Sequence, residues 1–217
     1  MAGPFVSGPF GPGPFDCQRN IPLLRLLKNI KKTCKNNHFS DIQSRIHAEI
    51  DEVIGSERLP TLDDKVNMDY INAFILESFR YTSFVPFVFH HSLEDIEYKG
   101  YHLPKDSALI YSLMHIMHDP TYFKNPEIFQ PERFLDSEGK FVNDERVVPF
   151  GIGKRFCLGR SLAEKEFFLF FVGLLQVFKF DNIPGIKPPP YEFDTVPVSG
   201  ILRTVPPYKC ILRLRDC

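Results

Sequence analysis

The segment from Ser161 to Phe178 constrains the fold more strongly than any other part of the chain. Its phenylalanine, leucine and valine side chains would cover nearly the whole circumference of an α-helix. A helix that is apolar almost all round is stable only where other elements cover it. We therefore predict a buried helix at 161–178, and the rest of the chain must pack around it.

Two more helices are predicted nearer the N-terminus. Ser40 and Gln43 have the spacing of a capping box, so the first helix is predicted to begin at Ser40 and to end before Gly55. Apolar residues recur along it at helical spacing. This stripe consists of Ile42, Ile46, Ile50 and Val53. The second helix is predicted at about 69–80, and its inward residues are Ile71, Phe74, Ile75 and Phe79.

Short strands and irregular connections account for most of the remaining sequence. Segment 84–113 has the pattern of strands and turns, with one turn at Lys99-Gly100. Prolines at 120, 126, 131 and 149 exclude long regular elements between 119 and 150. Near the C-terminus, Cys210, Leu212 and Leu214 alternate with Ile211, Arg213 and Arg215, as in a half-exposed strand. The predicted fold class is α+β, weighted toward helix.

The composition excludes several classes of protein. A hydrophobic fraction of 43% supports a packed core, and a formal net charge of -1 argues against a general nucleic-acid binder. Five cysteines without a C-x-x-C pair or zinc-ligand spacing indicate free thiols in a reducing compartment. The longest apolar run, 167–175, is too short to span a bilayer, and the N-terminus lacks the order of a secretory signal.

Residues 1–40 are predicted to be a separate, low-complexity segment. Gly-Pro-Phe occurs at 3–5, 8–10 and 13–15, a repeat that excludes helix and regular sheet because proline removes hydrogen-bond donors. The repeat is predicted to be disordered or extended. The basic stretch that follows it is predicted to be a marginal, solvated helix.

The segment before the buried helix has the composition of a ligand-binding loop. Gly151 and Gly153 precede Cys157, and Gly159 follows it, at the positive end of a helix dipole that favours thiolate over thiol. Thiolate binds iron, glycine lets a flat macrocycle approach the backbone, and Arg155 can pair with a propionate. A reactive or merely structural cysteine is the alternative. A P-loop is excluded, because Arg155 stands where Ser or Thr must coordinate magnesium.

The same segment carries a specific resemblance. The pattern Phe-x-x-Gly-x-Arg-x-Cys-x-Gly is matched at every fixed position from Phe150 to Gly159. It resembles the cysteine-ligand loop of the cytochrome P450 family, and the following Leu-Ala-Glu and Phe-Phe-Leu-Phe resemble the animal microsomal branch. The resemblance implies a haem cofactor with Cys157 as the ligand to iron. The other residues it places against the haem are Arg155, His91, Phe150, Gly151 and Gly159.

A second group of charged residues is predicted to have a structural role. Glu77 and Arg80 lie one helical turn apart, and their apolar neighbours indicate that this helix is partly buried. Buried charges require a closed network. The resemblance implies that Arg133 closes it. It also implies a substrate pocket bordered by Val85, Phe87, Val88 and Ile201. His115 and His118 have the spacing of metal ligands, but no third ligand is evident, so no metal is predicted there.

The resemblance covers about residues 41–217, the C-terminal haem-ligand part of the family's fold with its small β-sheets. This is less than half of a usual family chain. The distal helix, whose acid and alcohol deliver protons to bound oxygen, would precede residue 41, and residues 1–40 contain nothing like it. No catalytic residue is therefore identified.

The implied function is that of a monooxygenase, an oxidoreductase that hydroxylates lipophilic substrates with O2. Its electrons would come from an NADPH-dependent flavin reductase, and the full-length family member would lie at the cytosolic face of the endoplasmic reticulum membrane. The alternative function is a non-catalytic haem-binding or regulatory remnant. We do not expect this truncated chain to be active alone.

Overall fold

A computed structural model describes residues 38–185, 198–199, 202–203 and 209–215 of the chain. The predictions for residues 1–37 and for Ile201 lie outside the described residues. The α-helices in this part are α2 (His38–Val53), α3 (Asp69–Thr82), α4 (Leu113–Met117) and α5 (Arg160–Val177). Three short 3-10 helices are η1 (Leu62–Asn67), η2 (Pro131–Phe134) and η3 (Gly153–Arg155). The strands are β1 (Phe87–His91), β2 (Ile96–Tyr98), β3 (Tyr101–Leu103), β4 (Ala108–Ser112), β5 (Phe178–Asp181), β6 (Val198–Ser199), β7 (Leu202–Arg203) and β8 (Ile211–Leu214).

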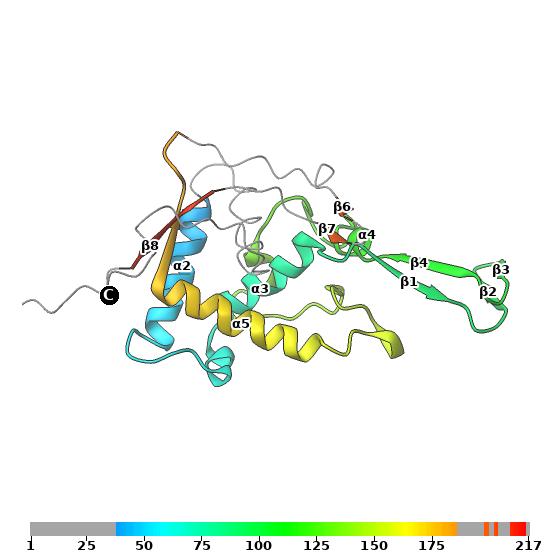
Figure 1. Ribbon diagram of the computed structural model, residues 1–217, viewed down its shortest axis with the longest axis horizontal. Helices are drawn as coiled ribbons and strands as arrows, with labels where there is room; N and C mark the ends of the chain where they lie inside the picture. The colour runs from blue at the N-terminus through cyan, green and yellow to red at the C-terminus, as the bar shows by residue number, and fades with distance from the viewer. Residues whose placement is uncertain (1–37, 186–197, 200–201, 204–208, 216–217) are drawn as a thin grey trace, which may run out of the picture.

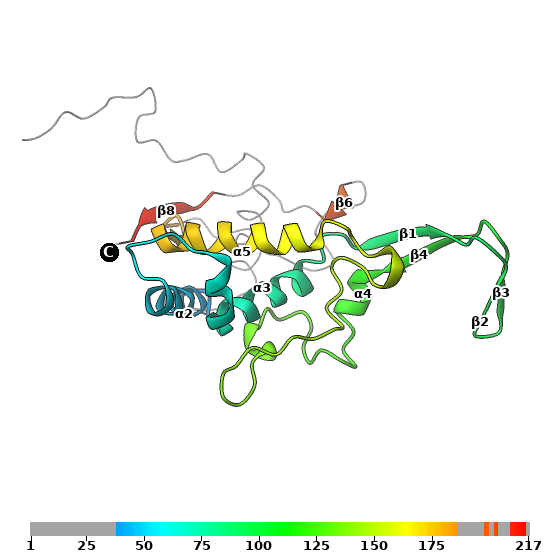
Figure 2. The same cartoon turned by 90° about the horizontal axis from the view of Figure 1, so that it is seen from below.

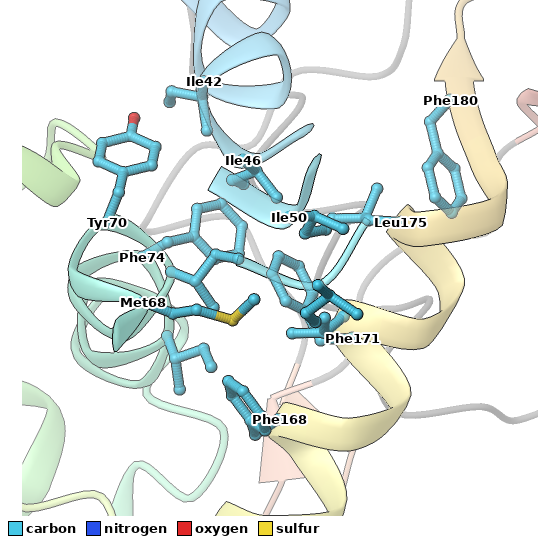
Figure 3. Packing of buried hydrophobic residues seen from close by; sticks show 14 of the residues in the cluster. Ile42, Ile46, Ile50, Met68, Tyr70, Phe74, Phe168, Phe171, Leu175 and Phe180 are labelled. Carbon is cyan, nitrogen blue, oxygen red and sulfur yellow. The ribbon is translucent and has the colours of Figure 1, made fainter. Parts of the chain in front are cut away.

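The main hydrophobic core lies where α2, α3 and α5 meet (Figures 1 and 3). Ile42, Ile46 and Ile50 of the predicted α2 stripe are buried, Val53 is partly buried, and the stripe faces aromatic rings from the other two helices. Phe74 of α3 stacks on Phe171 of α5 with ring centroids 4.7 Å apart, and it meets Phe129 edge-on at 5.5 Å. Such aromatic pairs add about 0.5–1.5 kcal/mol beyond the area they bury. These contacts hold the helices that carry the candidate site.

The start of α2 differs from the sequence prediction. The helix begins at His38, so Ser40 lies inside it and the predicted capping box is wrong. Gln43 is buried and turns toward β5 instead, where its side-chain oxygen accepts a hydrogen bond from Phe180 N at 2.9 Å. Its amide donates to the carbonyl of the same residue at 3.4 Å. A buried amide needs such partners, and they come from a strand that is distant in the sequence.

Helix α5 is buried on one side only. Phe168, Phe171, Val172 and Leu175 are buried against the core. Phe170, in contrast, is 64% exposed and Leu162 is 62% exposed. The prediction of a helix buried all round is therefore wrong for this chain, because none of the described elements covers that side.

The described strands form antiparallel pairs. In the pair of β1 and β4, Phe87 lies opposite Ser112 and His91 opposite Ala108. Together with β2 and β3 these strands form an arm that projects from the helices (Figures 1 and 2). The predicted turn at Lys99-Gly100 is confirmed: both residues have positive φ, 50° and 83°, as a type I′ hairpin turn requires. Helices with small antiparallel sheets also confirm the predicted α+β class.

The C-terminal strand β8 pairs with β5, which follows α5 directly. Leu214, predicted to point inward, is 71% exposed, whereas Arg215 is held against the helices. Arg215 donates to the carbonyls of Leu175 and Gln176 at the end of α5, and it forms an ion pair with Asp51 of α2 at 2.6 Å. These bonds reverse the predicted alternation at the end of the strand.

Candidate functional site

The cysteine loop, residues 150–159, lies immediately before α5. Its backbone is held by hydrogen bonds from Cys157 N to the Phe150 carbonyl, 2.9 Å, and from Arg160 N to the Cys157 carbonyl, 3.2 Å. Gly151 and Gly153 have positive φ, 77° and 68°, in a region that side chains with a Cβ rarely occupy. The two glycines therefore permit the turn that brings Cys157 to the start of the helix.

Cys157 is exposed and lies among exposed apolar residues. Its neighbours include Leu158, 95% exposed, with Phe156 at 47% and Leu162 at 62%. Arg155 is also exposed, and its side chain makes no hydrogen bond or ion pair within the described ranges. A soft sulfur ligand, an apolar surface and an unengaged cation fit a flat apolar group that carries carboxylates. The residues present thus match the chemistry of haem.

The structure shows whether a side chain would fit at Gly159. A Cβ built at this position would lie 3.7 Å from Cys157 Sγ, which is an ordinary van der Waals distance. The protein atoms alone do not require glycine here.

The remaining predicted haem and pocket residues lie on other elements. His91 ends β1 and is exposed, with Nδ1 3.3 Å from the Asp106 carbonyl. No contact joins it to Arg155 in the described structure, so its expected role as a propionate partner stays a prediction. Val88, in the same strand, packs against a second core cluster around α4. Phe150 meets Phe79 of α3 edge-on, with ring centroids 5.5 Å apart.

The structure does bring Glu77, Arg80 and Arg133 together. Glu77 and Arg80 are both fully buried, and Arg80 donates to the two Glu77 oxygens at 2.6 and 2.9 Å. Arg133 Nε donates to Glu77 Oε1 at 3.1 Å, from η2. Such charge-assisted, forked bonds offset the high cost of burying these ions. The three charges join α3 to the connection that leads toward the cysteine loop.

Backbone groups complete this network, and the sequence did not reveal them. The backbone N–H of Gln130 donates to Glu77 at 2.8 Å. The carbonyls of Met117 and Pro126 each accept from Arg80 at 2.9 Å. Every residue has a carbonyl and nearly every residue an N–H, so no residue type marks these partners in a sequence.

Glu49 is a further residue that sequence reasoning missed. Its two carboxylate oxygens accept the backbone N–H groups of Tyr70 and Ile71, each at 2.8 Å, and so cap α3 from α2. Burial raises the pKa of Glu49 above its usual value, although these two hydrogen bonds oppose the rise. The sequence does not predict this cap, because capping patterns are recognised within a few residues of the helix start and Glu49 lies far from α3 in the chain.

His115 and His118 bind different groups. His115 Nδ1 is 2.6 Å from the Ser112 hydroxyl, whereas His118 Nδ1 is 3.1 Å from the Met114 carbonyl. Burial, followed by the positive charge of Arg80, lowers the pKa of His118 to about 3. Among the described residues, no three side chains of metal-binding type are grouped to hold an ion.

An exposed cysteine just before a long helix, with exposed apolar neighbours, and a Glu-Arg-Arg network whose glutamate is fully buried are the arrangement expected of a haem-thiolate protein. The sequence model of the family described as Cytochrome P450 matches residues 38–212. Cytochrome P450 1A2 of Mesocricetus auratus is 41% identical over 176 residues, 79% of this chain and 33% of that protein. Cytochrome P450 2D14 of Bos taurus is 42% identical over 170 residues, 78% of this chain and 33% of that protein. Farnesoate epoxidase of Bombyx mori is 39% identical over 176 residues, 81% of this chain and 35% of that protein.

The chain belongs to the cytochrome P450 family, whose members bind haem. The expected resemblance to the animal microsomal branch is confirmed by these relatives. The chain spans about one third of the length of the curated relatives it matches. None of the helices in the described ranges has the length and hydropathy that a bilayer crossing requires.

Proposed function

We propose that this chain supplies the cysteine-ligand part of a haem-thiolate monooxygenase that hydroxylates lipophilic substrates. The proposal is carried by Cys157, an exposed cysteine in a complete ligand motif at the start of α5. Residues 41–217 would form the family domain, and residues 1–40 a separate segment. We place the full-length protein at the cytosolic face of the endoplasmic reticulum membrane, as its branch of the family suggests.

Each residue of the loop has a proposed role. Cys157 would bind the iron as thiolate, because α5 begins three residues later and its N-terminal dipole favours a negative charge nearby. Arg155 and His91 would bind the two propionates. Phe150, Gly151 and Gly159 would lie along the macrocycle, and Val85, Phe87, Val88 and Ile201 would border the substrate. When bound, the haem supplies the oxygen chemistry, which a thiolate ligand supports by donating electron density to the iron.

The Glu77 network would serve the site indirectly. It ties α3 to η2, and the connection after η2 leads into the cysteine loop. A loop held between this network and α5 keeps the ligand sulfur in one position. The role proposed for Arg80 and Arg133 is therefore structural, and neither takes part in chemistry.

The electron donor would dock beside the loop. Lys154 and Lys165 are exposed and make no ion pair within the described structure, whereas Arg160 is paired with Glu164 at 2.8 Å. The two lysines therefore leave more positive charge for an acidic partner than Arg160 does. An NADPH-dependent flavin reductase is the partner that the family implies.

The test is a spectrum of the purified chain after haem reconstitution, reduction and addition of carbon monoxide. We expect the Soret band at the long-wavelength position that marks a thiolate ligand, and Cys157→Ala should remove it. Cys34→Ala is the matched control and should keep it. A band at another position in the unmodified chain, or one indifferent to Cys157→Ala, would contradict the proposal. Turnover with reductase and NADPH then distinguishes a monooxygenase from a non-catalytic haem-binding remnant.

A further inference from the structure

The connection from η2 to the cysteine loop, residues 135–149, contains no helix and no named strand in the described structure. Its position must therefore come from contacts with other elements. We propose that Asp69, the first residue of α3, is a positioning residue that fixes this connection and so holds the cysteine loop in place. The inference rests on the proposed role of Cys157 as the ligand to iron.

The connection begins with a tight turn. Leu135 and Phe141 face each other across it in an antiparallel bridge, and Asp136 N donates to the Lys140 carbonyl at 2.9 Å. The Asp136 carboxylate accepts the N–H groups of Glu138 and Lys140, at 2.8 and 2.9 Å. The turn is thus closed by its own hydrogen bonds, so a contact at either end orients the whole turn.

Helix α3 holds this turn at both ends. On the side of η2, Arg133 Nε donates to Glu77 Oε1 at 3.1 Å. On the other side, about two helical turns earlier in α3, Asp69 Oδ1 accepts the Phe141 N–H at 2.9 Å and Oδ2 binds Lys140 Nζ at 3.0 Å. The attachment at Arg133 alone would let the turn pivot. The attachment at Asp69 fixes the direction in which the chain leaves the turn.

The Asp69 carboxylate does not cap its own helix. The N–H groups of Tyr70 and Ile71, in the first turn of α3, are bound by Glu49, each at 2.8 Å. Both oxygens of Asp69 bind residues of the connection instead. The Phe141 N–H holds the pKa of Asp69 below its usual value, so the carboxylate is ionised at neutral pH and this hydrogen bond is charge-assisted.

Residues 143–156, which lead from this attachment into the loop, have no such restraint. In the part of the chain that the structure describes, they form hydrogen bonds only among themselves and with Cys157. Packing contacts remain, such as that of Phe150 on Phe79, with ring centroids 5.5 Å apart. The hydrophobic effect is non-directional, so packing fixes a backbone less sharply than hydrogen bonds do. The bonds at 140–142 are the last directional restraints before the loop, and Asp69 supplies those to α3.

The restraint reaches Cys157 through the backbone. Phe150 follows the connection, and its carbonyl accepts the Cys157 N–H at 2.9 Å. Gly151 and Gly153 lie between them, and glycine gives a backbone more conformational freedom than any other residue. A displaced Phe150 therefore displaces Cys157, and with it the sulfur that would bind iron. Asp69 acts on the ligand only in this indirect way.

Hydrogen exchange of the haem-free 217-residue chain tests the restraint. In dilute Asp69→Ala, we expect peptides from 141–157 to exchange about tenfold faster than in the unmodified chain, the effect of losing one hydrogen bond to a charged group. Peptides from 168–176, in the part of α5 that packs into the main core, should change far less. Mass spectrometry of the digested chain measures both regions in one experiment.

Three variants separate this restraint from a general loss of stability. Asp69→Asn keeps an oxygen that can accept the Phe141 N–H and should recover most of the protection. Lys140→Met removes only the ion pair, whose lysine side chain is 68% exposed, and should leave exchange of the loop unchanged. Ile46→Val destabilises the main core away from the connection, and it should speed exchange of 168–176 at least as much as that of the loop.

The haem-reconstituted chain supplies a spectroscopic readout. After reduction and addition of carbon monoxide, Asp69→Ala should lower the share of the long-wavelength thiolate band, because a displaced sulfur binds iron less often. Asp69→Asn should restore that share, and Ile46→Val should leave it unchanged. A thiolate share in Asp69→Ala equal to that of the unmodified chain would contradict the inference.

Two exchange results would overturn the inference as well. One is unchanged exchange of 141–157 in Asp69→Ala, and the other is acceleration of 141–157 and 168–176 by the same factor. An unmodified chain without any thiolate band would instead contradict the proposed role of Cys157. The exchange experiment needs no haem, so it would still decide whether Asp69 holds the loop.

Discussion

Single residues in this chain owe their importance to burial as much as to residue type. Glu77 is fully buried and accepts hydrogen bonds from Arg80, Arg133 and the Gln130 N–H. Removing one cation leaves a buried carboxylate with less compensation, which costs far more than losing a pair on the surface. His118 illustrates the opposite case, because burial beside Arg80 keeps its ring neutral.

We predict that Arg133→Met lowers the free energy of unfolding by about 3 kcal/mol, because it removes one of the cations that compensate Glu77. Urea titration followed by circular dichroism measures the change. Arg213→Met is the control. It breaks the ion pair between Arg213, whose side chain is 64% exposed, and Asp181, and it should cost less than about 1 kcal/mol. Equal effects of the two substitutions would show that the network does not hold Glu77.

We predict that His118 makes the chain less stable as the pH falls. The pKa of His118 is lowered from 6.5 to about 3 in the folded chain, so below pH 6.5 the unfolded state binds a proton that the folded state does not. Between pH 7 and 5, where most carboxylates stay ionised, this difference costs about 2 kcal/mol of unfolding free energy. In urea titrations of His118→Asn, the loss of unfolding free energy between pH 7 and 5 should be smaller than in the unmodified chain by this amount. His115→Asn, at an exposed position, should behave like the unmodified chain.

At the scale of elements, α5 has two unlike faces. One packs between α2 and α3, where Phe171 is fully buried and stacks on Phe74. The other carries Phe170 and Leu162 into solvent. The helix is therefore part of the core on one side and carries exposed apolar side chains on the other, and the same residue type contributes differently on its two sides.

We predict that Phe171→Ala lowers the free energy of unfolding by about 3–5 kcal/mol, because it removes a buried ring and leaves a cavity. Phe170→Ala, one position earlier, should change it by less than about 0.5 kcal/mol. Both follow from the exposed fractions, 0% and 64%. Thermal melts of the two variants compare them directly, and similar melting temperatures would mean that the described burial of α5 is incorrect.

At the scale of the whole molecule, exposed apolar side chains gather at the cysteine loop and the start of α5. They include Ile152 at 71%, Leu158 at 95% and Leu162 at 62% exposure. Burying one such side chain stabilises a protein by roughly 1.5–3 kcal/mol, so contact of this surface with another apolar surface is favourable. Exposed apolar patches of this type mark interaction sites or aggregation hazards.

We predict that the 217-residue chain expressed alone self-associates, because this apolar surface stays in contact with water. The double variant Leu158→Ser with Phe170→Ser should increase the monomeric fraction in analytical ultracentrifugation. Val66→Ser, which removes a side chain that is 80% exposed but lies on η1, should have little effect. A chain that is monomeric in the same experiment would contradict this prediction.

The sequence by itself determined the local features of this protein. Helical spacing located α3 and α5, the Lys99-Gly100 pair located a hairpin turn, and the motif around Cys157 indicated the family. These features depend on residues within one or two turns of each other, where periodicity, backbone preference and motif spacing are visible in the sequence. The α+β class followed from the same local patterns.

Only the tertiary structure decided which surfaces and polar groups meet. Gln43 caps no helix because its partner is Phe180, and α3 is capped by Glu49, about twenty residues earlier in the chain. Phe170 and Phe171 differ in burial although both lie in one apolar run. The closing bonds to Glu77 include a backbone group and Arg133, which is 56 residues away. Burial and hydrogen bonding are settled by elements that pack from distant parts of the chain, and no local pattern records that packing.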